Sequence, residues 1–469
     1  MEMAAPARKK LPKLNILAFG VGSIPINMSF AIVVLYLAYF YTDVFLLPPA
    51  IMGVLFISCR VWDGINDPIM GMIGDRTNSR WGKFRPYLAI MPIPMIIFAG
   101  LTFYVPDMGV TGKIIWAFVT YFGLQMIKTA MAIPYFALPA LITTDATERT
   151  ALSSAAMFFG PVAFIIASVL ALKVVGKFPT EKEGFFFMTV IFVGFSAIFS
   201  YITFFSTKKY DYPGNDLFLR QEEAGNIPFK KNLQSITGNR PFIIAFLAFF
   251  LHNMYSAIVM GMAIYFFKYN LKMFDVYSKF MGLMLLSALI GALVSPLLVK
   301  KLGKKNAIQF SNLVCGGAML LIYLLSAGKG QAELLPLWKI GGLCFILICL
   351  SALASNVTPV VCMAVMADSI DFGEWKTGVR AQGFISAFFV MGNKVGMALG
   401  GAFIGLGLAY YDYLPNLAEY SETTLSGILI LGIGVPVVIR ALISVAMLFF
   451  NLSESRMAEI IAELNGVKA

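Results

Sequence analysis

The chain has 469 residues, of which 59% are hydrophobic and only 13% are charged, and its mean hydropathy is +0.80. This composition excludes an ordinary soluble domain. The net charge of +11 lies in the connections between apolar segments, so it does not indicate a nucleic-acid partner. No GxxxxGK[ST] motif is present, and no nucleophile and base accompany the single histidine, His252, so the sequence indicates neither an ATPase nor an enzyme and implies no cofactor.

Apolar runs long enough to cross a bilayer recur along the whole chain. A spanning helix needs roughly 20 predominantly apolar residues. Twelve such windows follow the basic N-terminal arm, centred near Ile32, Leu55, Ile97, Met126, Val162, Phe192, Met254, Leu286, Leu320, Ser351, Phe389 and Val437. We therefore predict an all-α membrane protein with twelve transmembrane helices.

The basic residues concentrate in alternate connections, including 75–85, 208–240 and 300–305. The positive-inside rule then predicts that both termini are cytoplasmic. The longest polar stretch of the chain lies within 207–240 and divides it into two halves. We predict a six-helix half (1–206), a central cytoplasmic loop (207–240), a second six-helix half (241–453) and a cytoplasmic tail (454–469). Two such halves make the major facilitator arrangement, in which the substrate binds between the halves near mid-membrane.

Charged residues inside a span are expensive, so each one is a functional candidate. The second span carries Arg60, Asp63 and Asp67, and the two aspartates share one helix face at i and i+4. A bound cation would relieve their repulsion, and Asn66 and Thr129 would add neutral oxygen ligands. The alternative is a structural salt bridge to Arg60 or Lys394.

Two lysines lie deep in other spans. Lys394, in the eleventh, needs a carboxylate partner, and it would reach the aspartate pair if the halves face each other. It would then either stabilise the empty cation site or form a purely structural ion pair. Lys128, in the fourth span, would either contact an anionic group of the substrate or serve as a second partner for the aspartates.

The second span also carries a family motif. RVWDGINDPIMGMIGDRTNSRWGKFRPYL (60–88) resembles the signature of the glycoside–pentoside–hexuronide cation symporters, the major facilitator branch that includes the melibiose permease. Further similarity appears in YFYTDVF, AIPYFAL, DATERTALSS and ADSIDFGEWKTGVRAQG. The resemblance covers nearly the whole chain.

The resemblance implies roles for particular positions. Asp63, Asn66, Asp67 and Thr129 match the cation-coordinating set, and Arg60 and Lys394 match a charge network. In the family, a clamp of charged side chains holds the sugar hydroxyls. The matching positions here carry neutral residues, namely Asn27, Ala132, Phe136 and Met157. We expect these four residues and Lys128 to bind the substrate. We predict a cytoplasmic gate at Asp75, Arg76, Arg80, Asp371, Glu374 and Arg380.

The sequence thus predicts a symporter of a bacterial-type cytoplasmic membrane, acting as a monomer. It would couple inward flow of a cation, Na+ in preference to H+ or Li+, to uptake of a sugar, a glycoside or a sugar acid. Lys128 and the lost clamp favour an acidic substrate. The rival functions are transport of another small organic anion, an uncoupled facilitator or exchanger of the same fold, and a receptor that binds without transporting.

Overall fold

The computed structural model describes residues 11–143, 146–212, 236–378, 382–415, 417 and 419–464. Helices and the turns between them make up these residues, and no strand occurs among them. The first part of the chain forms α1 (Lys13–Gly20), α2 (Ser23–Ile32), the π-helical segments η1 (Val33–Leu37) and η2 (Phe40–Val44), α3 (Pro49–Arg76), α4 (Arg85–Ile90), α5 (Pro92–Thr102), α6 (Val110–Ile142), α7 (Ala146–Val175) and α8 (Glu181–Ser206).

The second part begins with α11 (Arg240–Tyr265) and η3 (Phe266–Asn270). It continues with α12 (Phe274–Ser326), α13 (Gln331–Trp338), α14 (Leu343–Ser355), α15 (Val357–Thr377), α16 (Gln382–Tyr410), α17 (Glu422–Leu429), η4 (Ile430–Gly434), α18 (Val435–Leu448) and α19 (Glu454–Leu464). The long helix α12 contains two spans, because Gly303 breaks it with a φ of 77°. That left-handed conformation favours glycine.

The prediction of twelve transmembrane helices is confirmed. Each predicted centre lies in a helix, and eight continuous helices in the described part of the chain are long and apolar enough to cross a membrane. The helix α12 contributes two spans, and α3, α16 and the pair α4–α5 complete the twelve. The chain is therefore an all-α, multi-pass membrane protein.

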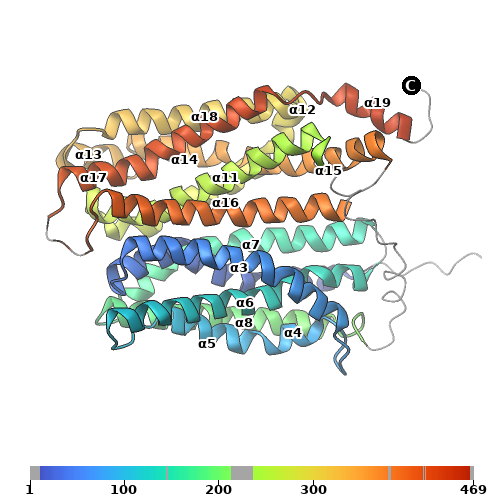
Figure 1. Cartoon of the computed structure of the whole chain (residues 1–469), viewed down its shortest axis with the longest axis horizontal. Coiled ribbons are helices and arrows are strands. Elements are labelled where there is room, and N and C mark those ends of the chain that lie inside the picture. Colours follow the sequence, from blue (N-terminus) through green and yellow to red (C-terminus); the bar gives the residue numbers. More distant parts are fainter. Residues whose placement is uncertain are drawn as a thin grey trace, which may run out of the picture.

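The helices lie in two bundles, one above the other in Figure 1. The lower bundle contains α2 to α8, and the upper one contains α11 to α18. Between the bundles, α3 packs on α16 and α7 packs on α12, and η1 also contacts α11. The first two pairs bring the second span beside the eleventh and the fifth beside the eighth.

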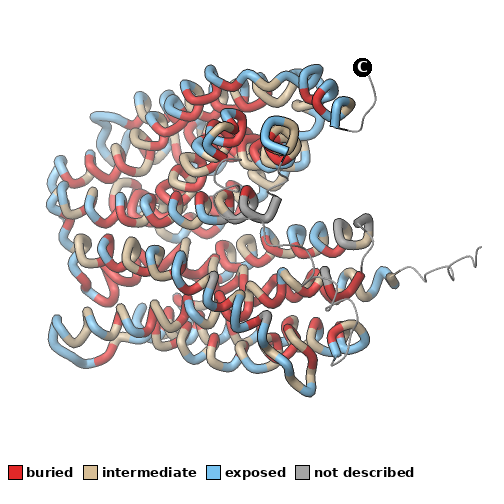
Figure 2. The backbone as a smooth tube through the Cα atoms, turned by 45° about the vertical axis from the view of Figure 1, so that its right-hand side comes forward, coloured by how far each residue is buried: buried red, intermediate tan, exposed pale blue. Residues whose placement is uncertain are grey.

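Large apolar side chains cover much of the outer surface. Leu293, Leu297, Leu313 and Leu324, all on α12, are 62–73% exposed. Buried residues lie on the helix faces that meet one another, as the tube in Figure 2 shows. An apolar exterior of this kind suits lipid rather than water as its solvent.

The first span of each bundle ends in the same local structure. Tyr39 is followed by η2 and Tyr265 by η3, and each π segment is followed by a residue with positive φ, Leu46 at 63° and Lys272 at 51°. The hydrogen bonds match as well, from the Phe45 N–H to the Phe40 carbonyl and from the Leu271 N–H to the Phe266 carbonyl. This repeated ending supports the internal repeat that the sequence suggests.

Candidate functional site

Glycines let α16 approach two helices closely. A Cβ on Gly396 would lie 2.5 Å from the Phe250 carbonyl oxygen of α11, and one on Gly405 would lie 2.6 Å from the Pro49 carbonyl oxygen of α3. Neither contact could be accommodated without moving backbone. Small residues at these crossings hold α16 between the bundles, as in other transmembrane helix pairs.

This packing presents Lys394 of α16 to the aspartates of α3. The Lys394 ammonium forms an ion pair with one oxygen of Asp67, and the Thr129 hydroxyl of α6 donates to the other oxygen at 3.1 Å. The structure therefore brings together the second, fourth and eleventh spans at Asp67, as the sequence predicts.

Asp63 lies one turn earlier and is 2% exposed. Its Oδ2 accepts a hydrogen bond from Arg60 Nη1 at 2.9 Å, whereas its Oδ1 is buried without a hydrogen-bond partner among the described residues. The amide nitrogen of the neighbouring Asn66 is likewise buried and unpartnered. Asp63 is thus paired with Arg60, and Asp67 is paired with Lys394. Asp63 retains one buried oxygen that could contact a ligand.

Lys128 has a different environment from the other two deep cations. Its ammonium lies 4.9 Å from the centroid of the Phe30 ring, a cation–π contact, and it forms no ion pair with a carboxylate of the described residues. Phe30 in turn packs edge-on against Phe164 at 5.8 Å. Lys128 is therefore not a second salt-bridge partner of the aspartates in this structure.

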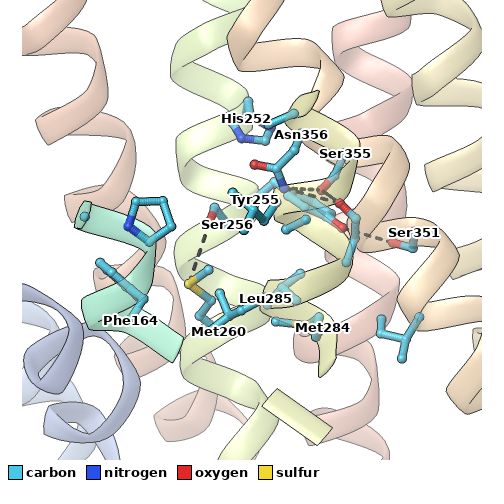
Figure 3. A pocket seen from close by; sticks show the side chains of 18 of the residues that line it. Phe164, His252, Tyr255, Ser256, Met260, Met284, Leu285, Ser351, Ser355 and Asn356 are labelled. Carbon is cyan, nitrogen blue, oxygen red and sulfur yellow. Dashed lines mark hydrogen bonds between the residues drawn. The ribbon is translucent and has the colours of Figure 1, made fainter. Parts of the chain in front are cut away.

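A cavity with a volume of about 340 Å³ lies between the two bundles. Asn27, Pro161 and Phe164 line it from the first bundle, and helices α11, α12 and α14 line it from the second. Figure 3 shows Phe164 facing the labelled side chains of the second bundle across this space. A cavity of this size suits a mono- or disaccharide-sized ligand.

Of the predicted substrate positions, only Asn27 lines this cavity. Lys128, Ala132 and Phe136 follow one another at i, i+4 and i+8 on one face of α6, and Phe136 is 60% exposed. Met157 on α7 is exposed one turn from Pro161, which does line the cavity. These positions lie beside the cavity rather than in its wall.

The predicted gate residues that the structure describes lie at or just beyond helix ends. Arg76 ends α3, and the exposed Arg80 lies 5.1 Å from the centroid of the Trp81 ring in the following turn. Asp371 and Glu374 lie in the last turns of α15. Arg380 and the side chain of Asp75 lie outside the described part of the structure.

At the opposite end of the bundles, six residues form what we call the aromatic latch: Tyr39, Thr42 and Asp43 of the first span with Tyr265, Lys268 and Tyr413 of the second bundle. The Tyr413 hydroxyl donates to Asp43 Oδ1 at 2.7 Å, and Lys268 Nζ lies 3.9 Å from that same oxygen. The Thr42 and Tyr265 hydroxyls are 2.8 Å apart. These bonds tie the two bundles together where each π segment ends.

The sequence interpretation missed several buried or half-buried charges, among them Asp43 and Lys268 in the latch and Arg440 in α18. Arg440 is 1% exposed in the middle of the last apolar span, GVPVVIRALISV. The rule that singled out Asp63, that a charge in hydrocarbon is expensive, applies equally to Arg440 and would have found it.

Comparison with known proteins places these features in a family. Residues 18–454 match the model of the family described as MFS/sugar transport protein. The isoprimeverose transporter of Lactiplantibacillus pentosus is 31% identical over 93% of this chain and 88% of its own length. The putative glycoside/cation symporter YagG of Escherichia coli is 31% identical over 96% and 94%, and the glucuronide carrier protein homolog of the same species is 26% identical over 97% and 96%.

Solved transporter structures share the fold. A bacterial homolog of the human lysosomal transporter Spinster superposes with a TM-score of 0.65 at 12% identity, covering 98% of this chain and all of that one. The xylose transporter XylE of E. coli gives a TM-score of 0.62 at 12% identity, covering 94% and 98%. Because the family model matches residues 18–454, the chain belongs to the MFS/sugar transport family and is a transporter, not an enzyme.

Proposed function

We propose that this chain is a symporter that couples inward flow of Na+ to uptake of a sugar, a glycoside or a sugar acid by alternating access. The observation that carries the proposal is the buried, unpartnered Oδ1 of Asp63 beside Asp67. Two carboxylates with the oxygens of Asn66 and Thr129 form a donor set that suits a hard cation. We expect Li+ or H+ to substitute for Na+.

The ion pair between Lys394 and Asp67 supplies the coupling step. A cation bound by both aspartates competes with the Lys394 ammonium for Asp67, and Lys394 belongs to α16, which joins the bundles through α3. Displacing the ammonium changes the contact between the bundles. Binding of the ion thereby favours one arrangement of the two bundles over the other.

Named relatives support a sugar-like substrate and cation coupling. One is an isoprimeverose transporter, one a putative glycoside/cation symporter and one a glucuronide carrier homolog. The first is named for a neutral disaccharide and the last for an acidic sugar derivative. Lys128, which has no carboxylate partner among the described residues, favours the acid, and by the same argument it favours another small organic anion as the second candidate.

The same proposal includes the topology. We place both termini, the loop 207–240 and the tail 454–469 in the cytoplasm of an inner-membrane protein, on the positive-inside argument. The halves 1–206 and 241–453 then move against each other, with the cytoplasmic gate at the ends of α3 and α15. We propose that the monomer is the working unit.

Uptake into proteoliposomes tests the function. We expect the purified protein to accumulate a sugar or sugar acid above its external concentration when an inward Na+ gradient is imposed, and to equilibrate it without the gradient. A panel of neutral sugars, glycosides, uronic acids and other small anions identifies the substrate. Equal uptake with and without Na+, H+ and Li+ gradients would establish an uncoupled facilitator, and binding without flux would establish a receptor.

Lys128→Ala separates acidic from neutral substrates. Removing an ammonium near the cavity should weaken uptake of an acidic substrate by about tenfold and leave a neutral one of the same ring structure nearly unchanged. Initial uptake rates over a concentration series measure the effect. Lys182→Ala removes the same charge from an exposed position on α8 and serves as the control. Equal losses for acidic and neutral substrates would assign Lys128 a structural role instead.

A further inference from the structure

Part of the wall that the second bundle contributes to the cavity is polar, beside apolar side chains such as Val259 and Leu285. His252, Tyr255 and Ser256 lie along α11, and Ser351, Ser355 and Asn356 face them from the neighbouring helix (Figure 3). No carboxylate and no lysine or arginine is among the described residues that line the cavity. The wall therefore offers hydroxyl, amide and imidazole groups to a ligand. A charged side chain lies behind these groups without lining the cavity.

That charge is Arg440 of α18. Its guanidinium donates to Asn312 Oδ1 at 3.1 Å and to Thr358 Oγ1 at 3.4 Å, and its carbon Cζ lies 3.8 Å from the centroid of the Tyr255 ring. All of these partners are neutral. Arg440 Nε is buried with no hydrogen-bond partner among the described residues.

The contrast with Arg60 is informative. Arg60 is also inside a span, but its guanidinium has the carboxylate of Asp63 at 2.9 Å. Arg440 forms no ion pair within the described part of the chain, although it is 1% exposed. Buried charges are normally paired because removing them from water is expensive, so the positive potential at Arg440 remains available to a ligand.

His252 connects Arg440 to the cavity. Arg440 Nη2 lies 3.2 Å from His252 Nδ1, and a guanidinium can only donate hydrogen bonds, so Nδ1 accepts and the ring proton sits on Nε2. Nε2 has no hydrogen-bond partner among the described residues, and His252 lines the cavity. The imidazole therefore offers the cavity an N–H donor that is polarised by the arginine behind it.

We propose that this wall is an anion subsite, in which His252 and Ser256 donate hydrogen bonds to the carboxylate of a sugar acid while Arg440 balances its charge from behind. The inference rests on the proposed function, because it assigns a binding mode to the proposed sugar-acid substrate. Lys128 approaches the same space from the first bundle, through Phe30 and Phe164. A carboxylate held here would thus feel one positive charge from each bundle.

Binding of matched pairs of an acidic and a neutral sugar tests the inference. The probes are D-glucuronate against D-glucose and D-galacturonate against D-galactose, titrated into the purified full-length protein by calorimetry. We expect the wild type to bind each acid more tightly than its neutral partner. Arg440→Gln should weaken acid binding about tenfold or more and neutral binding by less than about twofold.

Two further variants test the inference even if Arg440→Gln does not fold. Arg440→Lys retains the charge and should keep most of the preference for the acids, whereas His252→Leu removes the donor and should lower it. Arg456→Gln neutralises a half-exposed arginine on α19 and should change nothing. A wild type that does not prefer the acids, or equal losses for acid and neutral sugars in these variants, would overturn the inference.

The outcomes for the two proposals are distinct. Gradient-driven uptake of neutral sugars alone would leave the symporter proposal standing and remove the anion subsite. Acid-selective binding that depends on Arg440, with no gradient-driven uptake of any substrate, would leave the subsite standing and remove the coupling.

Discussion

Asp63→Asn and Asp67→Asn should each abolish Na+-driven accumulation, so that internal substrate levels off at its external concentration. Asparagine keeps the shape of the side chain but removes the negative charge that attracts the ion and opposes the ammonium of Lys394. Exchange of labelled for unlabelled substrate across the membrane should continue, because it needs no net movement of the ion. Uptake and counterflow measured on the same proteoliposomes separate these two activities.

The matched control is Asp107→Asn, since Asp107 is an exposed aspartate in the connection before α6. It should leave accumulation intact. In the wild type, saturating substrate should raise Na+ affinity by the same factor by which Na+ raises substrate affinity, typically about 5- to 150-fold for coupled sites. Full accumulation by both span-two variants, or a Na+ affinity that substrate leaves unchanged, would remove the ion site from this aspartate pair.

Gly405→Ala should have the second large effect, although glycine has no side chain that could bind an ion or a substrate. The added methyl would lie 2.6 Å from the Pro49 carbonyl oxygen and 2.7 Å from the Gly53 nitrogen, so α3 and α16 must separate. Overpacking of this kind destabilises by about 1–3 kcal/mol. The separation also draws Lys394 away from Asp67, so we expect a lower melting temperature together with reduced Na+-driven uptake.

Gly71→Ala is the appropriate comparison, because Gly71 lies on α3 and a Cβ there meets nothing within 4 Å. It should be neutral or slightly stabilising, since alanine favours helix more than glycine does. Normal melting temperature and uptake in Gly405→Ala would mean that the contact between α3 and α16 is not the route from ion to bundle movement.

The sequence predicted the spans well because their signal is composition over about 20 residues, which depends little on tertiary contacts. The aspartate pair was also predictable, since i and i+4 fix two side chains on one helix face. The pairing of Lys394 with Asp67 followed once two six-helix halves were assumed to face each other. The break at Gly303 and the π segments were not predictable, because short local deviations leave no periodic pattern.

The cavity wall was the hardest part to predict. Resemblance placed Ala132, Phe136 and Met157 at the substrate, but sequence position does not give the rotation of α6 and α7 relative to the second bundle, and of the predicted substrate positions only Asn27 lines the cavity. The sequence also did not indicate that His252 contacts Arg440 and lines the cavity.

The aromatic latch has a thermodynamic consequence for every ligand of this protein. Its bonds exist only while the bundles meet at that end, so they add to the free energy that separates this arrangement from the alternate one. A change of about 1.4 kcal/mol in the latch shifts the ratio of the two arrangements tenfold, and the apparent affinity of any ligand that prefers one arrangement shifts with it. The ion pair between Asp43 and Lys268 therefore affects how fully distant binding sites are occupied, although it contacts none of their ligands.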